Sequence, residues 1–245
     1  MAADGTRRTR SGPKRPLTGA ALRKAIMAIW CVGFCGLQWR AIGQLCDIPF
    51  GTLYTLFARW TRLWRRLLNR LIQAWRRACG DKPVPSAVIL DSRSCRSAPT
   101  CFGRGFDGGK KIKGIKVHLA VDKYGFPLAI TVSPANRHDS KGIVPVLHQL
   151  AGRGFKGTAL GDLSYRGQRL AGEALGITIQ LSAGGHGGTF IPEGIRVERS
   201  LAWISRYRRL NTIFERGHLV AFIEIAFISI LSRRLVRLVT REISA

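Results

Sequence analysis

The chain has 245 residues, and 46% of them are apolar, which excludes a disordered chain of low hydrophobicity. Forty lysines and arginines face fourteen aspartates and glutamates, so the formal charge at pH 7 is +26. Self-repulsion on this scale destabilises a compact chain unless a polyanion relieves it, and the usual polyanion is a nucleic acid backbone. A basic surface with no such partner is the alternative, and it explains this charge less well.

The composition argues against a zinc site, a secretory signal and a membrane span. The six cysteines include no C-x-x-C pair, and free thiols in a reducing cytosol are expected. The N-terminus is polar and basic, which is unlike a signal peptide. The apolar segment 219–231 is short for a bilayer and contains Glu224, so it predicts a buried helix. Arg233, Arg234 and Arg237 suit the end of that helix.

The first third of the chain has a helical pattern. Residues 1–16 are basic and predict a flexible arm, and residues 17–80 predict a small all-α domain. It contains a short amphipathic helix over 39–45 and, after a break, a long helix over 53–78 that Thr52 can cap. Two helices with a tight connection indicate a helix-turn-helix-like domain, although small bundles of other function share this pattern.

One face of the long helix is rich in arginine and contains no acidic residue. A solvated face usually mixes both charges, so this face is expected to contact DNA. Its arginines are Arg59, Arg62, Arg65, Arg66 and Arg70, of which Arg59, Arg62 and Arg66 are the candidate DNA-binding residues. The tryptophans of the same helix are expected in the core: Trp60, Trp64 and Trp75.

Residues 81–86 read as a linker, and residues 87–240 predict a mixed α/β domain. The apolar run 87–90 predicts a buried strand that ends at Asp91, and the strand over 158–161 is followed by Asp162. Further strands are expected over 115–121, 128–132 and 178–181, and helices over 143–150, 168–175 and 197–209.

Carboxylates after two strands and on a later helix can converge at one edge of a sheet. Asp91, Asp162 and Glu198 are the candidates, and Glu193 and Glu215 compete for the third position. Carboxylate oxygens suit hard divalent cations, and two such ions can clamp the attacking and leaving oxygens of a phosphodiester. The residues alone leave a metal site and ordinary strand-end aspartates about equally supported.

Histidines offer weaker candidates. His118 lies within a predicted strand and is expected to be structural. His138 and Asp139 can be read as an acid–base pair, but no Ser or Cys nucleophile motif accompanies them, so a turn role is favoured. The glycine-rich stretch 102–113 forms no phosphate-binding fingerprint.

Five motifs resemble, in the same order, those of bacterial insertion-sequence transposases of the DDE type, most closely the insertion-sequence-five group. They are Ile89–Ser92, Lys113–His118, Pro134–Ser140, Gly161–Gly167 and Arg196–Leu210. Thirty-five residues lie between the second aspartate and the glutamate, a spacing typical of DDE enzymes. The resemblance covers about residues 86–235.

The resemblance implies a ribonuclease-H-like mixed sheet with flanking helices. It also implies that Asp91, Asp162 and Glu198 are catalytic and hold two Mg²⁺ ions, for which Mn²⁺ can substitute. Tyr165 would position a strand or lie in the core, with equal support. Four arginines would line the DNA path in preference to forming a solvated face: Arg199, Arg206, Arg208 and Arg209.

The sequence departs from the family pattern in three places, one of which is that the stretch before Glu198 lacks the usual aromatic residue. Ser205 stands where relatives often carry Lys or Arg, and residues 184–188 are glycine-rich where relatives are often basic. The expected function is metal-dependent cleavage and transfer of DNA strands at the terminal inverted repeats of a mobile element, into target DNA. Two ends must meet, so a homodimer on DNA is expected in the bacterial cytoplasm, at the nucleoid. The alternatives are a non-catalytic DNA-binding regulator and a metal-dependent nuclease.

Overall fold

The computed structural model describes residues 19–181 and 194–243. Four helices come first: α1 (Gly19–Cys35), α2 (Trp39–Leu45), α3 (Phe50–Arg59) and α4 (Thr61–Ala78). The predicted helix over 39–45 is confirmed. The arm over 1–16 lies outside the described residues.

The predicted long helix over 53–78 is wrong as a single element. It begins at Phe50, with Pro49 rather than Thr52 at the N-cap, and it breaks at Trp60, whose φ is −87° and ψ is 4°. The two halves face different partners, since α3 packs on α1 and α2 while α4 packs along α9 (Leu219–Ile243). Tertiary packing therefore overrides a continuous helical pattern.

A mixed sheet forms the second part of the chain, which confirms the α/β prediction. One half of the sheet contains β4 (Pro127–Pro134), β3 (Ile112–Val121) and β1 (Ala87–Ser97), and adjacent strands within this half are antiparallel. Next to β1, β5 (Thr158–Gly161) and β6 (Thr178–Leu181) run parallel to it. The short strands β2 (Gly105–Asp107) and β7 (Thr212–Ile213), which the sequence pattern does not predict, pair with β3 and β1.

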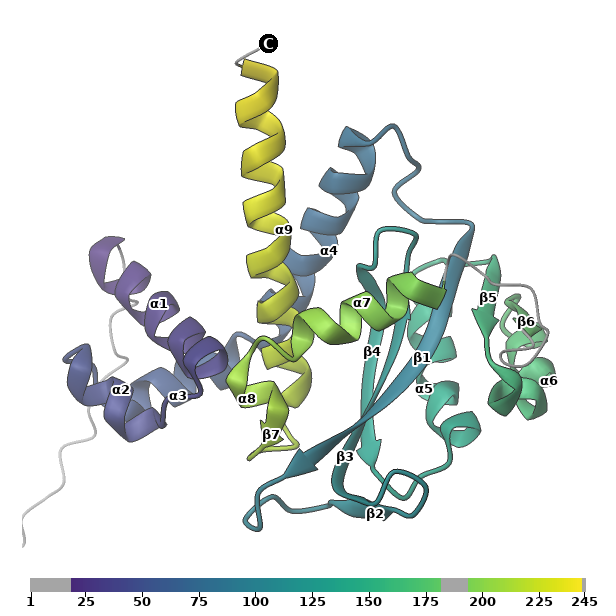
Figure 1. Cartoon of the computed structure of the whole chain (residues 1–245). Helices are drawn as coiled ribbons and strands as arrows, with labels where there is room; N and C mark the ends of the chain where they lie inside the picture. Colours follow the sequence, from purple (N-terminus) through teal and green to yellow (C-terminus); the bar gives the residue numbers. More distant parts are fainter. Residues whose placement is uncertain (1–18, 182–193, 244–245) are drawn as a thin grey trace, which may run out of the picture.

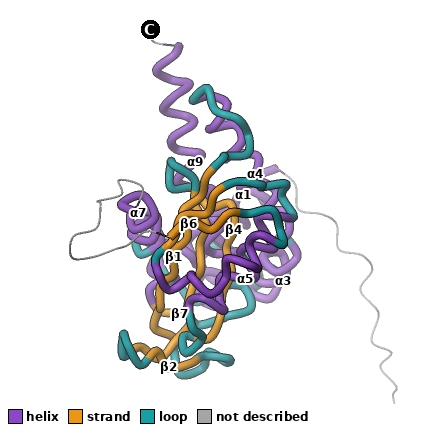
Figure 2. Tube along the Cα trace, turned by 90° about the vertical axis from the view of Figure 1, so that its right-hand side faces the viewer, coloured by secondary structure: helices purple, strands orange, loops and turns teal. Residues whose placement is uncertain are grey.

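Helices cover both faces of this sheet (Figures 1 and 2). On one face lie α5 (Asp139–Ala151), the 3₁₀ helix η1 (Leu163–Gln168) and α6 (Arg169–Glu173). On the other face lie α7 (Gly194–Ile204), α8 (Arg208–Asn211) and α9. Successive side chains of β1 point to opposite faces of the sheet. Val88 and Leu90 join the core beneath α5, whereas Ile89 and Cys95 join the core of α7 and α9.

Several predicted bounds in this part differ from the structure. β3 begins at Ile112 and α5 at Asp139, before the expected 115 and 143. β1 does not end at Asp91, because β3 stays paired with it as far as Arg96. The predicted helix over 197–209 breaks after Ile204 into α7 and α8. The helix over 168–175 is shorter and follows a 3₁₀ turn.

The N-terminal helices share one apolar core with α7–α9 and the sheet. In Figure 1, α4 and α9 rise side by side. At the end of α4, Arg76 Nη1 lies 2.8 Å from Asp122 Oδ2 in the β3–β4 turn, and both side chains are buried. Asp81 of the expected linker accepts hydrogen bonds from Lys123 and Tyr124 of the same turn. The domain boundary at 81–86 stays a prediction.

The predicted buried helix over 219–231 is confirmed, and it continues to Ile243. Arg233, Arg234 and Arg237 are therefore not in its last turn, contrary to the expectation. Within residues 19–181 and 194–243, no helix combines the length and apolar character that crossing a bilayer requires. All six cysteines are free thiols.

Candidate active site

The pairing of β1 with β5 brings the two candidate aspartates together. Ile89 is the register partner of Leu160, and Asp91 and Asp162 each lie two residues further along. Asp162 keeps an extended backbone, with φ −75° and ψ 176°. By strand alternation the Asp91 side chain points to the face that α7 covers, the same face as Ile89, whereas Asp162 follows the end of β5 and its carboxylate caps η1.

The surroundings of Asp91 favour its protonated form. Burial raises its pKa from 3.8 to about 6, and the charges of Asp162 and Asp139 act in the same direction. A hydrogen bond of 2.7 Å from the Ser92 amide to Oδ1 and the charge of Lys110 oppose this rise. A carboxylate that is desolvated beside another carboxylate is a typical feature of a functional site.

This pKa predicts a stability gain in the variant Asp91→Asn. Below about pH 3 the carboxyl group is protonated in both states and near pH 4 the difference between them is small, whereas above about pH 6 the folded protein carries a penalised charge. Asparagine removes this charge and still accepts the Ser92 hydrogen bond. Urea unfolding at pH 7.5 should show a gain of about 1–3 kcal/mol, which becomes small near pH 4. Equal stability of the two proteins at pH 7.5 would contradict the raised pKa.

Asp162 ends the extended segment and starts η1. Its Oδ1 accepts a 3.0 Å hydrogen bond from the Ser164 amide and another from the Ser164 hydroxyl, which fixes the orientation of the carboxylate. The phenol ring of Tyr165 is buried against Gly161, where an added Cβ would lie 2.6 Å from the ring. Tyr165 is therefore a core residue.

Glu198 lies on α7, the helix that crosses β1 in Figure 1, and its side chain is exposed. Two contacts fix this helix: Ser200 Oγ donates to the Gly125 carbonyl at 2.7 Å, and Arg93 Nη1 donates to the Leu201 carbonyl at 3.0 Å. The structure thus places the candidate Glu198 on a helix that packs against β1, the strand that contains Asp91. In the part of the chain that the structure describes, no group of three or more His, Cys, Asp or Glu side chains lies close enough together to hold a metal ion, so Glu198 is not brought together with Asp91 and Asp162.

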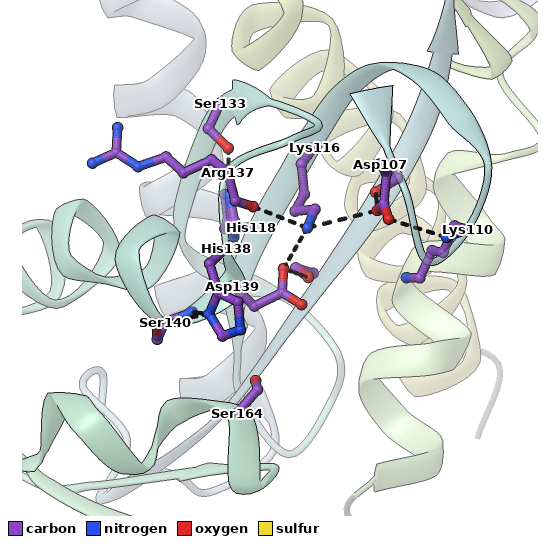
Figure 3. A network of polar contacts seen from close by, with 12 residues as sticks. Asp107, Lys110, Lys116, His118, Ser133, Arg137, His138, Asp139, Ser140 and Ser164 are labelled. Carbon is purple, nitrogen blue, oxygen red and sulfur yellow. Dashed lines mark hydrogen bonds and ion pairs between the residues drawn. The ribbon is translucent and has the colours of Figure 1, made fainter. Parts of the chain in front are cut away.

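A buried polar network, which the sequence did not predict, lies on the opposite face of β1 (Figure 3). Lys116 Nζ on β3 lies 2.9 Å from Asp139 Oδ1 and 3.7 Å from Asp107 Oδ2. Ser92 Oγ donates to Asp139 at 2.7 Å, directly beside Asp91 in the chain. Burial acts to raise the pKa of Asp139, but the hydrogen bonds from Lys116 and Ser92 outweigh it and lower that pKa. The network holds β1, β3 and the start of α5 together around Ser92, the residue that follows Asp91.

The two candidate histidines, His118 and His138, form contacts that stabilise the fold, as expected. His118 is fully buried, its Nε2 lies 2.9 Å from Ser133 Oγ, and burial lowers its pKa to about 4. Gly142 of α5 packs so closely on the imidazole that a Cβ would lie 2.0 Å from it. His138 caps α5 by accepting from the Ser140 amide. The Asp139 carboxylate, expected in a turn, instead belongs to the network of Lys116.

Most of the arginines proposed to contact DNA are exposed. They are Arg59, Arg62 and Arg66 on α3 and α4, and Arg199, Arg206 and Arg208 beside or beyond α7. An open pocket beside α4 is lined by Thr61, Arg62, Arg65, Arg66 and Asn69. Arg209 differs: it is 6% exposed, forms an ion pair with Glu215 and lies over the Phe214 ring. Its guanidinium therefore faces the interior of the protein.

The family match agrees with this part of the structure. Residues 82–180 match the family model of a transposase DDE domain. The match covers two-fifths of the chain, including Asp91 and Asp162, and it supports a DDE transposase. The mixed sheet with flanking helices is consistent with the ribonuclease-H-like fold of such a domain. No curated protein matches the chain.

The remaining candidates have less support as site residues. Glu215 forms an ion pair with Arg209. Glu193 and residues 184–188 lie outside the described residues. Ser205 follows the end of α7, where its hydroxyl donates to the Ala202 carbonyl at 2.7 Å. The exposed Arg206 beside it carries the positive charge at this turn.

Proposed function

We propose that the chain is a transposase that binds the ends of a mobile DNA element and catalyses metal-dependent strand cleavage and strand transfer. The observation that carries the proposal is the adjacency of Asp91 and Asp162 across β1 and β5, within a segment that matches a transposase DDE domain. Glu198, on the helix α7 that packs on β1, is the proposed third carboxylate. The insertion-sequence-five group is the proposed relationship, by motif.

The donor set suits hard divalent cations. Asp91 and Asp162 supply only oxygen atoms as ligands. The raised pKa of Asp91 reflects the free-energy cost of its buried negative charge, and a bound cation would offset that cost. We propose that Asp91, Asp162 and Glu198 hold two Mg²⁺ ions, or Mn²⁺. Held by these carboxylates, the ions would supply the charge needed to activate a water or a 3′-hydroxyl and to stabilise the leaving oxygen of a phosphodiester.

The chain's own groups hold the carboxylates in place. The Ser92 amide orients Asp91, and Ser164 orients Asp162. Behind Asp91, the bond from Ser92 to Asp139 ties β1 to α5. Orientation before binding lowers the cost of reaching the reactive geometry, since the carboxylates need not reorganise.

Exposed arginines supply the proposed DNA surface, and they predict its salt dependence. In the variant Arg62→Gln/Arg66→Gln, affinity for duplex DNA should fall about equally for element ends and unrelated sequence. The slope of log affinity against log salt should become shallower by about one for each phosphate that the variant no longer neutralises. Fluorescence anisotropy between about 50 and 200 mM salt measures both. The variant Lys141→Gln/Lys156→Gln, which removes the same charge from exposed positions elsewhere, is the control, and an equal fall in affinity there would contradict a specific surface.

The test of function uses the full chain and DNA that carries the sequences flanking its reading frame. We expect nicking at the terminal repeats that requires Mg²⁺ or Mn²⁺. Binding without cutting would support a regulator descended from a transposase, and cutting without joining would support a nuclease on the same fold. We propose a homodimer on DNA, because the reaction joins two ends, and a cytoplasmic location at the nucleoid.

A further inference from the structure

Three arginines from two helices gather around Trp203 on α7, the helix that contains Glu198. Arg199 follows Glu198 on α7, while Arg234 and Arg237 lie one turn apart on α9. The guanidinium carbons of Arg199 and Arg234 lie 5.1 Å and 4.4 Å from the centre of the same ring, the indole of Trp203. Arg234 also lies 5.2 Å from the centre of the Phe126 ring. We call Arg199, Arg234 and Arg237 the α7–α9 arginine cluster.

Neighbouring positive charges are costly unless an anion is present. Burial lowers the pKa of Arg234, and the charges of Arg199 and Arg237 lower it further. None of the ion pairs formed among residues 19–181 and 194–243 includes a member of the cluster. The charges are therefore concentrated without a carboxylate partner in the described structure.

The aromatic rings determine which ligand the cluster fits. A guanidinium that lies over a ring uses its face for that contact and keeps its N–H edge for an acceptor. Planar N–H edges match the oxygens of phosphate, which accept bidentate hydrogen bonds. The position of Arg234 in the interior of α9, several residues before Ile243, excludes a role at the end of that helix.

We propose that the α7–α9 arginine cluster binds a backbone phosphate of the DNA strand that lies across Glu198. This inference rests on the proposed function and adds α9 to the DNA-binding elements. The cluster holds the strand at a fixed distance from the carboxylates, while the α4 arginines bind DNA elsewhere. Trp203 and Phe126 are positioning residues that keep Arg234 in place.

The test is the variant Arg199→Gln/Arg237→Gln, which changes two exposed side chains and leaves Arg234 on its rings. We expect about tenfold weaker binding of a duplex carrying the element end at about 150 mM salt, with a shallower salt slope. Arg234→Lys, which keeps the charge but loses the planar edge, should weaken binding as well. The control Lys141→Gln/Lys156→Gln should bind nearly as the wild type does, and circular dichroism and thermal melting check that each variant folds.

The binding assay separates this inference from the proposed function. If the wild type binds DNA but does not cut it, weaker binding by Arg199→Gln/Arg237→Gln would support the phosphate site, while the absence of cutting would overturn the transposase proposal. Unchanged binding and unchanged cleavage in Arg199→Gln/Arg237→Gln would overturn the phosphate site and leave the transposase proposal standing. A decrease no larger than that of the lysine control would overturn the phosphate site, since it would reflect net charge alone.

Discussion

Replacing Asp91 with alanine is expected to abolish metal-dependent nicking of element ends while DNA binding stays within about twofold of the wild type. The carboxylate is proposed to hold a catalytic cation, and metal ions contribute several kcal/mol to the stabilisation of a phosphoryl-transfer transition state. Each 1.36 kcal/mol is a factor of about ten, so the nicking rate should fall by at least about a thousandfold. Single-turnover cleavage of a labelled duplex measures the rate.

The matched control for Asp91 is Glu173→Gln, which removes an exposed carboxylate from α6. Its nicking rate should equal that of the wild type. Nicking by Asp91→Ala at the wild-type rate would contradict the assignment of the site. The variant Asp91→Asn keeps the hydrogen bond from Ser92 and should be equally inactive, so an active Asp91→Asn would also count against it.

The buried pair of Arg76 and Asp122 is expected to have the largest single effect on stability. Their side chains are 5% and 0% exposed, and Arg76 Nη1 lies 2.8 Å from Asp122 Oδ2. Burial raises the pKa of Asp122, and hydrogen bonds from the Phe126 amide and from Arg76 oppose that rise. The variant Arg76→Met leaves the carboxyl group buried without its counter-charge, so unfolding free energy should fall by about 3–5 kcal/mol.

Urea unfolding measures this decrease, and two further variants show its origin. Arg76→Met/Asp122→Asn should recover much of the stability, because the uncompensated charge is gone. Lys123→Met breaks the more exposed pair with Asp81 and should lower the unfolding free energy far less than Arg76→Met does. A decrease in Arg76→Met no larger than that in Lys123→Met would show that the buried pair does not join α4 to the sheet as described.

The strands of the second part could be predicted well because they are short apolar runs between turn residues. The bounds expected for 158–161 and 178–181 are those observed. The end of β1 could not be predicted in this way. Beyond Asp91 the strand is largely polar, and it stays extended because it pairs with β3, where Ser94 lies opposite Lys116. A pattern within one segment contains no information on that partner.

Helix breaks could not be predicted for a similar reason. The pattern around Trp60 is continuous, and the break arises because α3 and α4 pack on different elements. The burial of Arg209 depends on its ion pair with Glu215, and nothing in the spacing of the two residues indicates that pair. The position of Arg234 in the interior of its helix depends on the length of α9, which continues beyond the apolar segment 219–231 to Ile243.

For the candidate site, the expectation that Asp91 and Asp162 lie at one edge of the sheet agrees with the parallel pairing of β1 and β5, although β1 continues past Asp91. That expectation needed only two short strands, and the register of β1 and β5 agrees with it. The network of Lys116 was not predictable, because a single lysine in a strand has no distinctive spacing from Asp107 and Asp139. Its closest signal was the position of Asp139 directly after a helix-capping histidine.

Strand transfer tests the central claim most directly. Pre-nicked DNA with the element's terminal sequence, a target plasmid, Mg²⁺ and the full chain should give a product in which the element's 3′ end is covalently joined to the target. We expect this product with the wild type and none with Asp91→Ala. Formation of the product by Asp91→Ala, or only hydrolysed ends with the wild type, would contradict the assignment of the chain as a transposase that acts through these carboxylates.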